Sequence, residues 1–202
     1  MAFASNDLNE IFFVDGAESV LNDQYKDALT SAAAHFIEQF SISHEVDVYV
    51  SKRSVVQIIS ASARAWHMPP SYDTGNSVVC VYVDPESHIK QNIVSLAHEM
   101  IHVWQVERGD FQGSLWKGMD LQSLPYMLQP WEIEAHGFME EIASMYFKDK
   151  FLSKKELHEI TLKTDQVFQK VVEDAQASKN KETLKKVGKV AAAIGLGALL
   201  GI

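Results

Sequence analysis

The residues best placed to do chemistry are His98, Glu99 and His102, which lie in one apolar segment of the chain. Histidines four positions apart lie about one turn apart on a single face of an α-helix, so both imidazoles can reach the same metal ion. Glu99 lies one step round the helix, where its carboxylate can meet a metal-bound water. The spacing therefore predicts a zinc site that activates water for hydrolysis.

The neighbours of this motif favour a buried helix over an exposed one. They are apolar, namely Leu96, Ala97, Met100, Ile101 and Val103. Burying three polar side chains among them costs free energy unless each side chain finds a partner, and a metal ion provides one. The alternative is a surface helix that carries two solvated histidines and a glutamate.

A catalytic zinc ion needs a third protein ligand, with one position left open for water. Arg108 and Gln105 stand where the metzincin pattern has its third histidine and its glycine, so that pattern does not apply. The remaining candidate segment is Pro-Trp-Glu-Ile-Glu-Ala-His at residues 130–136. Pro130 favours the start of a helix, and Glu132 would lie in its first turn, where the helix dipole favours a carboxylate.

These two segments together resemble the gluzincin zinc peptidases, whose second helix carries Glu-x-x-Ala followed by Asp or Asn. The matching stretch is Glu-Ile-Glu-Ala-His at residues 132–136. The resemblance covers about residues 76–147 and implies a zinc ion held by His98, His102 and Glu132. The same region also resembles small metallopeptidase-like proteins that are common in phages and prophages.

The position after the alanine departs from the gluzincin pattern, because it holds His136 in place of an acid or amide. His136 could orient a metal-binding histidine, stabilise the oxyanion of the transition state, or replace Glu132 as the third ligand. Glu134 is a further alternative ligand, although it would point roughly 200° away from Glu132 around a helix. Tyr126, in the preceding loop, could donate a hydrogen bond to the oxyanion or simply anchor the loop.

The resemblance implies a metallopeptidase that hydrolyses peptide or protein substrates. A bound Zn²⁺ ion would lower the pKa of its water and polarise the substrate carbonyl, and Glu99 would carry the proton to the leaving amine. The alternative is a catalytically silent protein of the same fold that regulates or binds a partner. A purely structural zinc site is disfavoured, because such sites often use thiolates and Cys80 is the single cysteine.

The composition narrows the class of protein and its partners. A chain of 202 residues, 47% of them hydrophobic, can bury the core of one domain. A formal net charge of −9 argues against nucleic acid as a partner, because binding phosphates needs a basic face. One cysteine permits no internal disulfide, and residues 1–7 lack the pattern of a signal peptide, so we expect a cytoplasmic protein.

Hydrophobic periodicity predicts the elements that position these residues. Helices are expected over residues 17–40, 87–108, 131–148 and 154–178, strands over 45–50 and 77–83, and a helical tendency over 55–66. We expect a zincin-like α+β fold. A small, mostly antiparallel sheet between residues 46 and 84 would pack on the helix that carries His98 and His102, here called the metal helix. A second helix with Glu132 and a helical C-terminal region would follow.

The strand just before the metal helix lines the substrate cleft in zinc peptidases of this general type. By that resemblance, Val79, Val81 and Val83 are candidates to pair with an extended substrate. The alternative is that they form an internal core strand.

The expected organisation is a metallopeptidase domain over residues 1–150, a helix over 151–178 packed on it, and an apolar tail over 179–202. Residues 190–202 are 13 uncharged residues that follow several lysines. They are too few to span a bilayer, which needs about 20 residues. Plain packing or disorder is the favoured expectation for residues 187–202, and the alternative is that they lie on a membrane surface or bind a protein partner.

Overall fold

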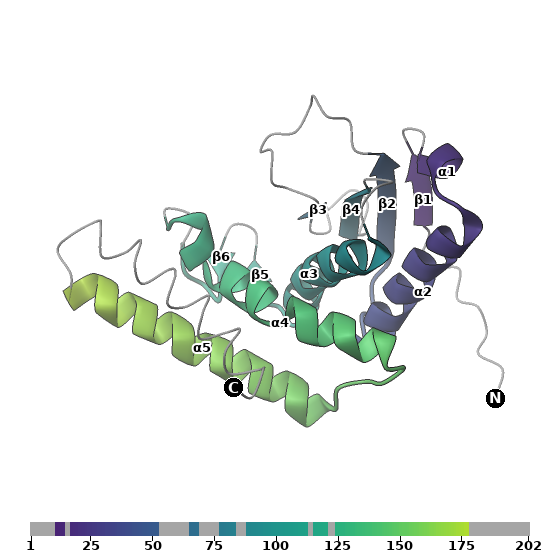
Figure 1. The fold of residues 1–202 in the computed structure, drawn as a ribbon. Coiled ribbons are helices and arrows are strands. Elements are labelled where there is room, and N and C mark those ends of the chain that lie inside the picture. Colours follow the sequence, from purple (N-terminus) through teal and green to yellow (C-terminus); the bar gives the residue numbers. More distant parts are fainter. Residues whose placement is uncertain are drawn as a thin grey trace. The chain divides into compact units, whose positions relative to one another are not determined.

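The computed structural model describes residues 11–14, 17–52, 65–68, 77–83, 88–112, 115–120 and 124–177. The chain forms two compact units, Met1–Glu107 and Arg108–Ile202. The described residues form both helices and a small sheet, which confirms the α+β class (Figure 1). The predictions for residues 55–64 and for the tail over 179–202 lie outside the described residues, whereas residues 65 and 66 belong to a strand.

The first unit contains a four-stranded sheet with the order β1-β2-β4-β3. Its strands are β1 (Ile11–Val14), β2 (Val46–Lys52), β3 (Ala65–Met68) and β4 (Ser77–Val83). β1 pairs with β2 and β2 with β4 in parallel, and β3 runs antiparallel to β4. The expectation of a mostly antiparallel sheet is therefore wrong.

Two physical reasons account for this error. β1 is absent from the sequence-based expectation because its four apolar residues show no alternation with polar ones. The chain between β1 and β2 contains helices α1 (Ala17–Val20) and α2 (Asp23–Phe40), the kind of crossover that parallel strands require. Residues 53–76 separate β2 from β4, which is also long enough for a parallel connection.

The helix expected over residues 17–40 is divided into α1 and α2. The break falls at Asn22, whose side chain accepts a hydrogen bond of 2.9 Å from the backbone N–H of Tyr25. An asparagine in this position satisfies a backbone donor that the first turn leaves open, and so it starts a new helix.

Helix α3 (Ile89–Glu107), which carries the histidine motif, packs on α2, β3 and β4. The Phe40 ring of α2 stacks on the Trp104 ring of α3, with ring centroids 4.9 Å apart. The sheet contributes buried valines that alternate along β2 and β4: Val46, Val48, Val50, Val79 and Val81. The chain leaves α3 through Gly109, whose φ of 75° lies in the left-handed region that favours glycine.

The C-terminal end of α3 is held by a hydrogen-bonded cluster around Glu107. His44 links the Glu107 carboxylate, at 2.7 Å from Nδ1, to the Ser77 hydroxyl, at 2.8 Å from Nε2. Burial opposes the charge of Glu107, but the hydrogen bonds from Ser43 and His44 outweigh it and lower its pKa. The arrangement has the order of a serine–histidine–acid triad, yet Ser77 is fully buried, so the cluster joins elements and cannot meet a substrate.

The second unit begins with a small hairpin and continues with helices. The hairpin strands are β5 (Phe111–Gln112) and β6 (Leu115–Trp116), followed by the short 3₁₀-helix η1 (Tyr126–Leu128) and helices α4 (Pro130–Phe147) and α5 (Lys154–Ala177). The rings of Phe111, Trp116 and Trp131 lie with centroids 5.1 to 5.8 Å apart. This aromatic cluster fixes the hairpin against the first turn of α4.

Helix α5 packs on α4 through one apolar face. The buried residues of that face are Leu157, Ile160, Thr164, Phe168 and Val171. No helix in the described part of the chain is long and apolar enough to cross a membrane. Membrane or partner binding by residues 187–202 stays a prediction.

The start of α5 allows a direct test of the local fold. The backbone N–H of Ser153 donates to Glu156 Oε2 at 2.7 Å, and the N–H of Glu156 donates back to Ser153 Oγ at 3.3 Å. We expect Ser153→Ala to lower the free energy of unfolding by about 1 kcal/mol, as measured by urea denaturation, because this capping box is lost. Ser31→Ala, at an exposed position within α2, is the control, and an equal loss there would contradict the capping role.

Candidate functional site

The two motif histidines lie one turn apart on α3, and both are buried. Their Nε2 atoms are 3.2 Å apart, and the two rings meet edge to face. Two nitrogen ligands of a tetrahedral zinc ion, each at about 2.0 to 2.1 Å from the metal, are separated by about 3.3 to 3.4 Å. The observed spacing therefore fits two ligands of a single zinc ion.

Glu99, also on α3, adds a carboxylate beside the two histidines. Its side chain is buried, and its Oε1 atom lies 3.9 Å from Nε2 of His98. Burial, together with the negative charge of Glu99, raises the pKa of the Cys80 thiol on β4 to about 11. Cys80 is half-buried and is a neutral thiol at neutral pH, which disfavours a role as a nucleophile.

Burial lowers the pKa of His98 to about 4. The native protein thus keeps this imidazole neutral at pH values where an exposed histidine would carry a proton. A neutral ring retains a nitrogen lone pair, which is the form that binds a metal ion.

Because the pKa of His98 is lowered on folding, we expect the folded protein to lose stability in acid. The unfolded chain takes up a proton at His98 near pH 6.5 and the folded chain only near pH 4, so metal-free protein should lose stability as the pH falls between these values. The loss should be on the order of 3 kcal/mol. Urea denaturation at about pH 7.5 and about pH 4.5 measures it. His98→Asn should remove this part of the pH dependence, whereas His158→Asn, at an exposed position on α5, should preserve it. Equal acid sensitivity in wild type and His98→Asn would contradict the prediction.

One polar partner on α3, Gln105, was not predicted from the sequence. This side chain is completely buried, and its Oε1 atom lies 2.8 Å from Nδ1 of His102. The available signal was an amide three positions after a candidate ligand, inside an otherwise apolar stretch. Residues that bond the second nitrogen of a ligating histidine fix its orientation and its tautomer.

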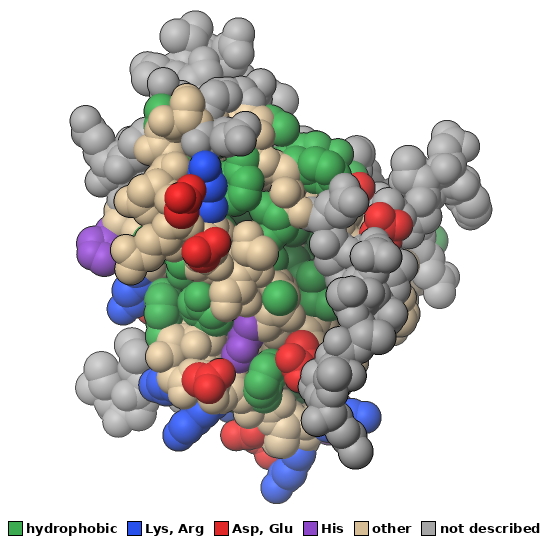
Figure 2. Space-filling view, turned by 90° about the vertical axis from the view of Figure 1, so that its right-hand side faces the viewer, with side chains coloured by type: hydrophobic (Ala, Val, Ile, Leu, Met, Phe, Trp, Pro, Cys, Tyr) green, Lys and Arg blue, Asp and Glu red, His purple; other side chains and the backbone are tan. Residues whose placement is uncertain are grey.

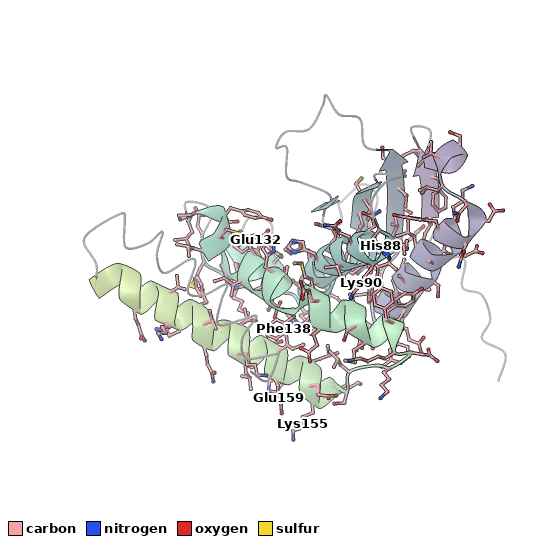
Figure 3. The ribbon with its side chains drawn as sticks, viewed as in Figure 1. His88, Lys90, Glu132, Phe138, Lys155 and Glu159 are labelled. Carbon is pink, nitrogen blue, oxygen red and sulfur yellow. The ribbon has the colours of Figure 1, made fainter. Side chains whose placement is uncertain are left out.

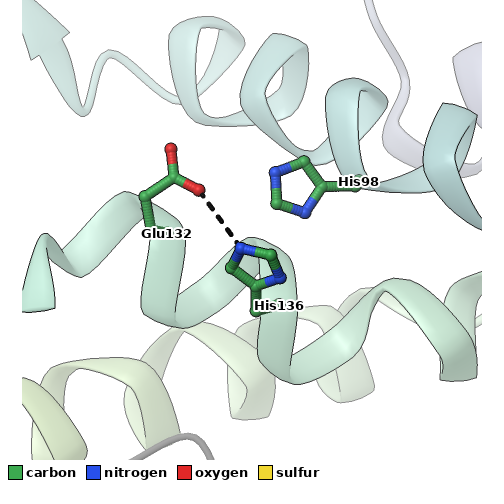
Figure 4. A group of neighbouring side chains, drawn as sticks. All are labelled: His98, Glu132 and His136. Carbon is green, nitrogen blue, oxygen red and sulfur yellow. Dashed lines mark ion pairs between the residues drawn. The ribbon is translucent and has the colours of Figure 1, made fainter. Parts of the chain in front are cut away.

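The remaining candidate ligands belong to the second unit. Glu132 is buried in the first turn of α4, and one of its carboxylate oxygens, Oε2, lies 3.7 Å from Nε2 of His136, one turn further along (Figure 4). Glu132 lies near the start of the helix, whereas Phe138 lies between α4 and α5 (Figure 3). Figure 4 also draws His98, which belongs to the first unit.

Tyr126 lies beside this pair. Its ring is edge-on to the His136 ring, with centroids 6.2 Å apart, and the residue is 55% exposed. The backbone around it is fixed, because Leu128 is buried against Val171 and the Gln129 amide donates to the carbonyl of Leu124. Tyr126 is thus positioned next to a candidate ligand and is open to a molecule from solvent.

Glu134 has a different role from its neighbours on α4. Its carboxylate forms a bidentate ion pair with Arg108, with distances of 3.1 Å to Nη1 and 2.6 Å to Nη2. Arg108 also binds Asp110 and donates to the Thr161 hydroxyl at 2.9 Å. Because Glu134 is fully buried in this network, it joins α4 to the start of the unit and to α5 and is poorly suited to hold a metal ion.

The strand residues proposed to pair with substrate lie in β4, which is bordered by β2 on one side and β3 on the other. Val79 and Val81 face Val48 and Val50 of β2, and they also face residues of β3. Their backbone groups are therefore occupied, and the internal-strand alternative describes these two residues. Val83 pairs with Lys52 and lies past the end of the β3 ladder.

The surface carries apolar and charged side chains side by side (Figure 2). The large exposed hydrophobic residues among those described are Met119, Tyr126, Met127, Phe147, Phe151 and Leu162. Isolated exposed apolar residues are common on soluble proteins and do not by themselves mark a binding surface.

Comparisons with protein-family models, curated proteins and solved structures give no match to this chain.

Proposed function

We propose that this protein is a zinc-dependent metallopeptidase of the gluzincin type with a zincin-like fold. The observation that carries the proposal is the buried histidine pair of α3, whose Nε2 atoms are 3.2 Å apart. A carboxylate beside this pair, from Glu99, supplies the group that a zinc hydrolase uses as its general base.

The proposed zinc ligands are His98, His102 and Glu132. Glu132 is preferred to Glu134 because Glu134 is taken up by Arg108, whereas Glu132 lies buried at the start of α4. His136, on the same face of α4 as Glu132, is proposed to donate a hydrogen bond to the oxyanion, with Tyr126 beside it.

A bound zinc ion would supply an acidified water and a polarised substrate carbonyl. Glu99 accepts a proton from the attacking water and returns it to the leaving amine, so that one carboxylate serves first as base and then as acid. An extended peptide would pair with β3, which is bonded to β4 on one side and, among the described strands, has no neighbour on the other.

Zinc content of purified variants tests the ligand set. Wild type should hold one equivalent of zinc, and both His102→Ala and Glu132→Ala should lose it. Glu140→Ala, which removes an exposed carboxylate from the same helix, is the matched control and should retain the metal. Retention by Glu132→Ala together with loss by His136→Ala would reassign the third ligand to His136. A wild type without zinc would refute the proposal.

A further inference from the structure

Three polar side chains form a continuous chain along the buried face of α3. Gln105 Oε1 lies 2.8 Å from His102 Nδ1, and His102 Nε2 lies 3.2 Å from His98 Nε2. Gln105 is 0% exposed, and His98 and His102 are 7% and 8% exposed. With so little access to water, each of these contacts needs a donor opposite an acceptor.

The donor and the acceptor of each hydrogen bond follow from Gln105, which ends this row of three side chains. A carbonyl oxygen can only accept, so the hydrogen of the first contact belongs to Nδ1 of His102. A neutral imidazole carries one N–H, which leaves Nε2 of His102 with a lone pair. The hydrogen of the second contact must then belong to Nε2 of His98 in the metal-free protein.

We propose that Gln105 is a positioning residue that holds His102 ready to bind metal, whereas His98 must change tautomer when metal binds. His102 already presents a lone pair on the nitrogen that faces its neighbour. His98 presents a hydrogen there and must move its proton from Nε2 to Nδ1 before Nε2 can coordinate an ion. The part of this inference that concerns metal binding rests on the proposed zinc site. The tautomers expected in the metal-free protein do not depend on that proposal.

Nitrogen NMR of ¹⁵N-histidine-labelled protein tests the tautomers directly. In metal-free protein, His102 should be protonated on Nδ1 and His98 on Nε2. Adding zinc alone should switch the pattern of His98 and leave that of His102 unchanged. A metal-free His102 protonated on Nε2 would overturn the inference.

Substitutions at Gln105 test its action through His102. Gln105→Leu removes the acceptor, so His102 should become a mixture of tautomers and zinc affinity should fall by about 10- to 100-fold. Gln105→Glu keeps an acceptor and raises the basicity of the ring, so it should preserve the His102 tautomer and bind zinc at least as tightly as wild type. Zinc affinity is measured by competition with a chelator.

Gln39→Leu is the matched control, because Gln39 is also a buried glutamine but lies on α2. It should change neither the His102 tautomer nor the zinc affinity, even if it lowers thermal stability. Equal zinc affinity in wild type and Gln105→Leu would overturn the role of Gln105. The predicted tautomers in a protein that binds no zinc would refute the proposed function alone and leave the hydrogen-bond assignment in place.

Discussion

Glu99→Gln is expected to abolish peptide cleavage while zinc remains bound. The amide has almost the shape of the carboxylate, so the buried site should keep its packing. It cannot accept a proton from water, and loss of a general base lowers the rate by about 10²- to 10⁴-fold. The measurement is kcat/KM on a peptide found by screening a library, with zinc content determined on the same sample.

Glu140→Gln is the control for this substitution, because it neutralises an exposed carboxylate of α4. It should keep the wild-type rate. Cleavage at the wild-type rate by Glu99→Gln would remove Glu99 from the mechanism, and loss of zinc from that variant would assign Glu99 to the metal instead.

Glu134→Gln is expected to lower the free energy of unfolding by about 1.5 to 3 kcal/mol, because the amide cannot replace the charged, bidentate contact with Arg108, which keeps only its contact with Asp110 as an ion pair. The Arg108 guanidinium would lose a bidentate contact with a residue that is fully buried. Urea denaturation at neutral pH measures the change.

The matched control is the exposed pair of Lys155 and Glu159 on α5, which lie 3.9 Å apart (Figure 3). Exposed pairs contribute little to stability, so Glu159→Gln should leave the unfolding free energy almost unchanged. An equally small effect for Glu134→Gln would mean that the network is not structural and would return Glu134 to the candidate ligands.

The helices and the histidine motif were predictable because both depend on local spacing. Apolar residues at helical intervals indicated α3, α4 and α5, and Ser153 with Glu156 marked the start of α5. Such signals involve residues within a few positions of one another, and tertiary packing did not override them.

The parallel direction of the strands could not be predicted from local spacing. Parallel pairing depends on the length and course of the connections, through α1 and α2 for β1 with β2 and through residues 53–76 for β2 with β4, whereas the alternation within one strand is the same in either direction. The sequence also left the role of Glu134 open, because its partner Arg108 lies 26 positions earlier in the chain. Gln105 was overlooked because only its contact with His102 distinguishes it from an ordinary helix residue.

The most direct test of the central claim is zinc-dependent peptide cleavage by the wild-type protein. A chelator should remove both the zinc and the cleavage activity, and one equivalent of added zinc should restore cleavage in wild type but not in Glu99→Gln. Cleavage that continues after all zinc has been removed, or a wild-type protein that never binds zinc, would contradict the account.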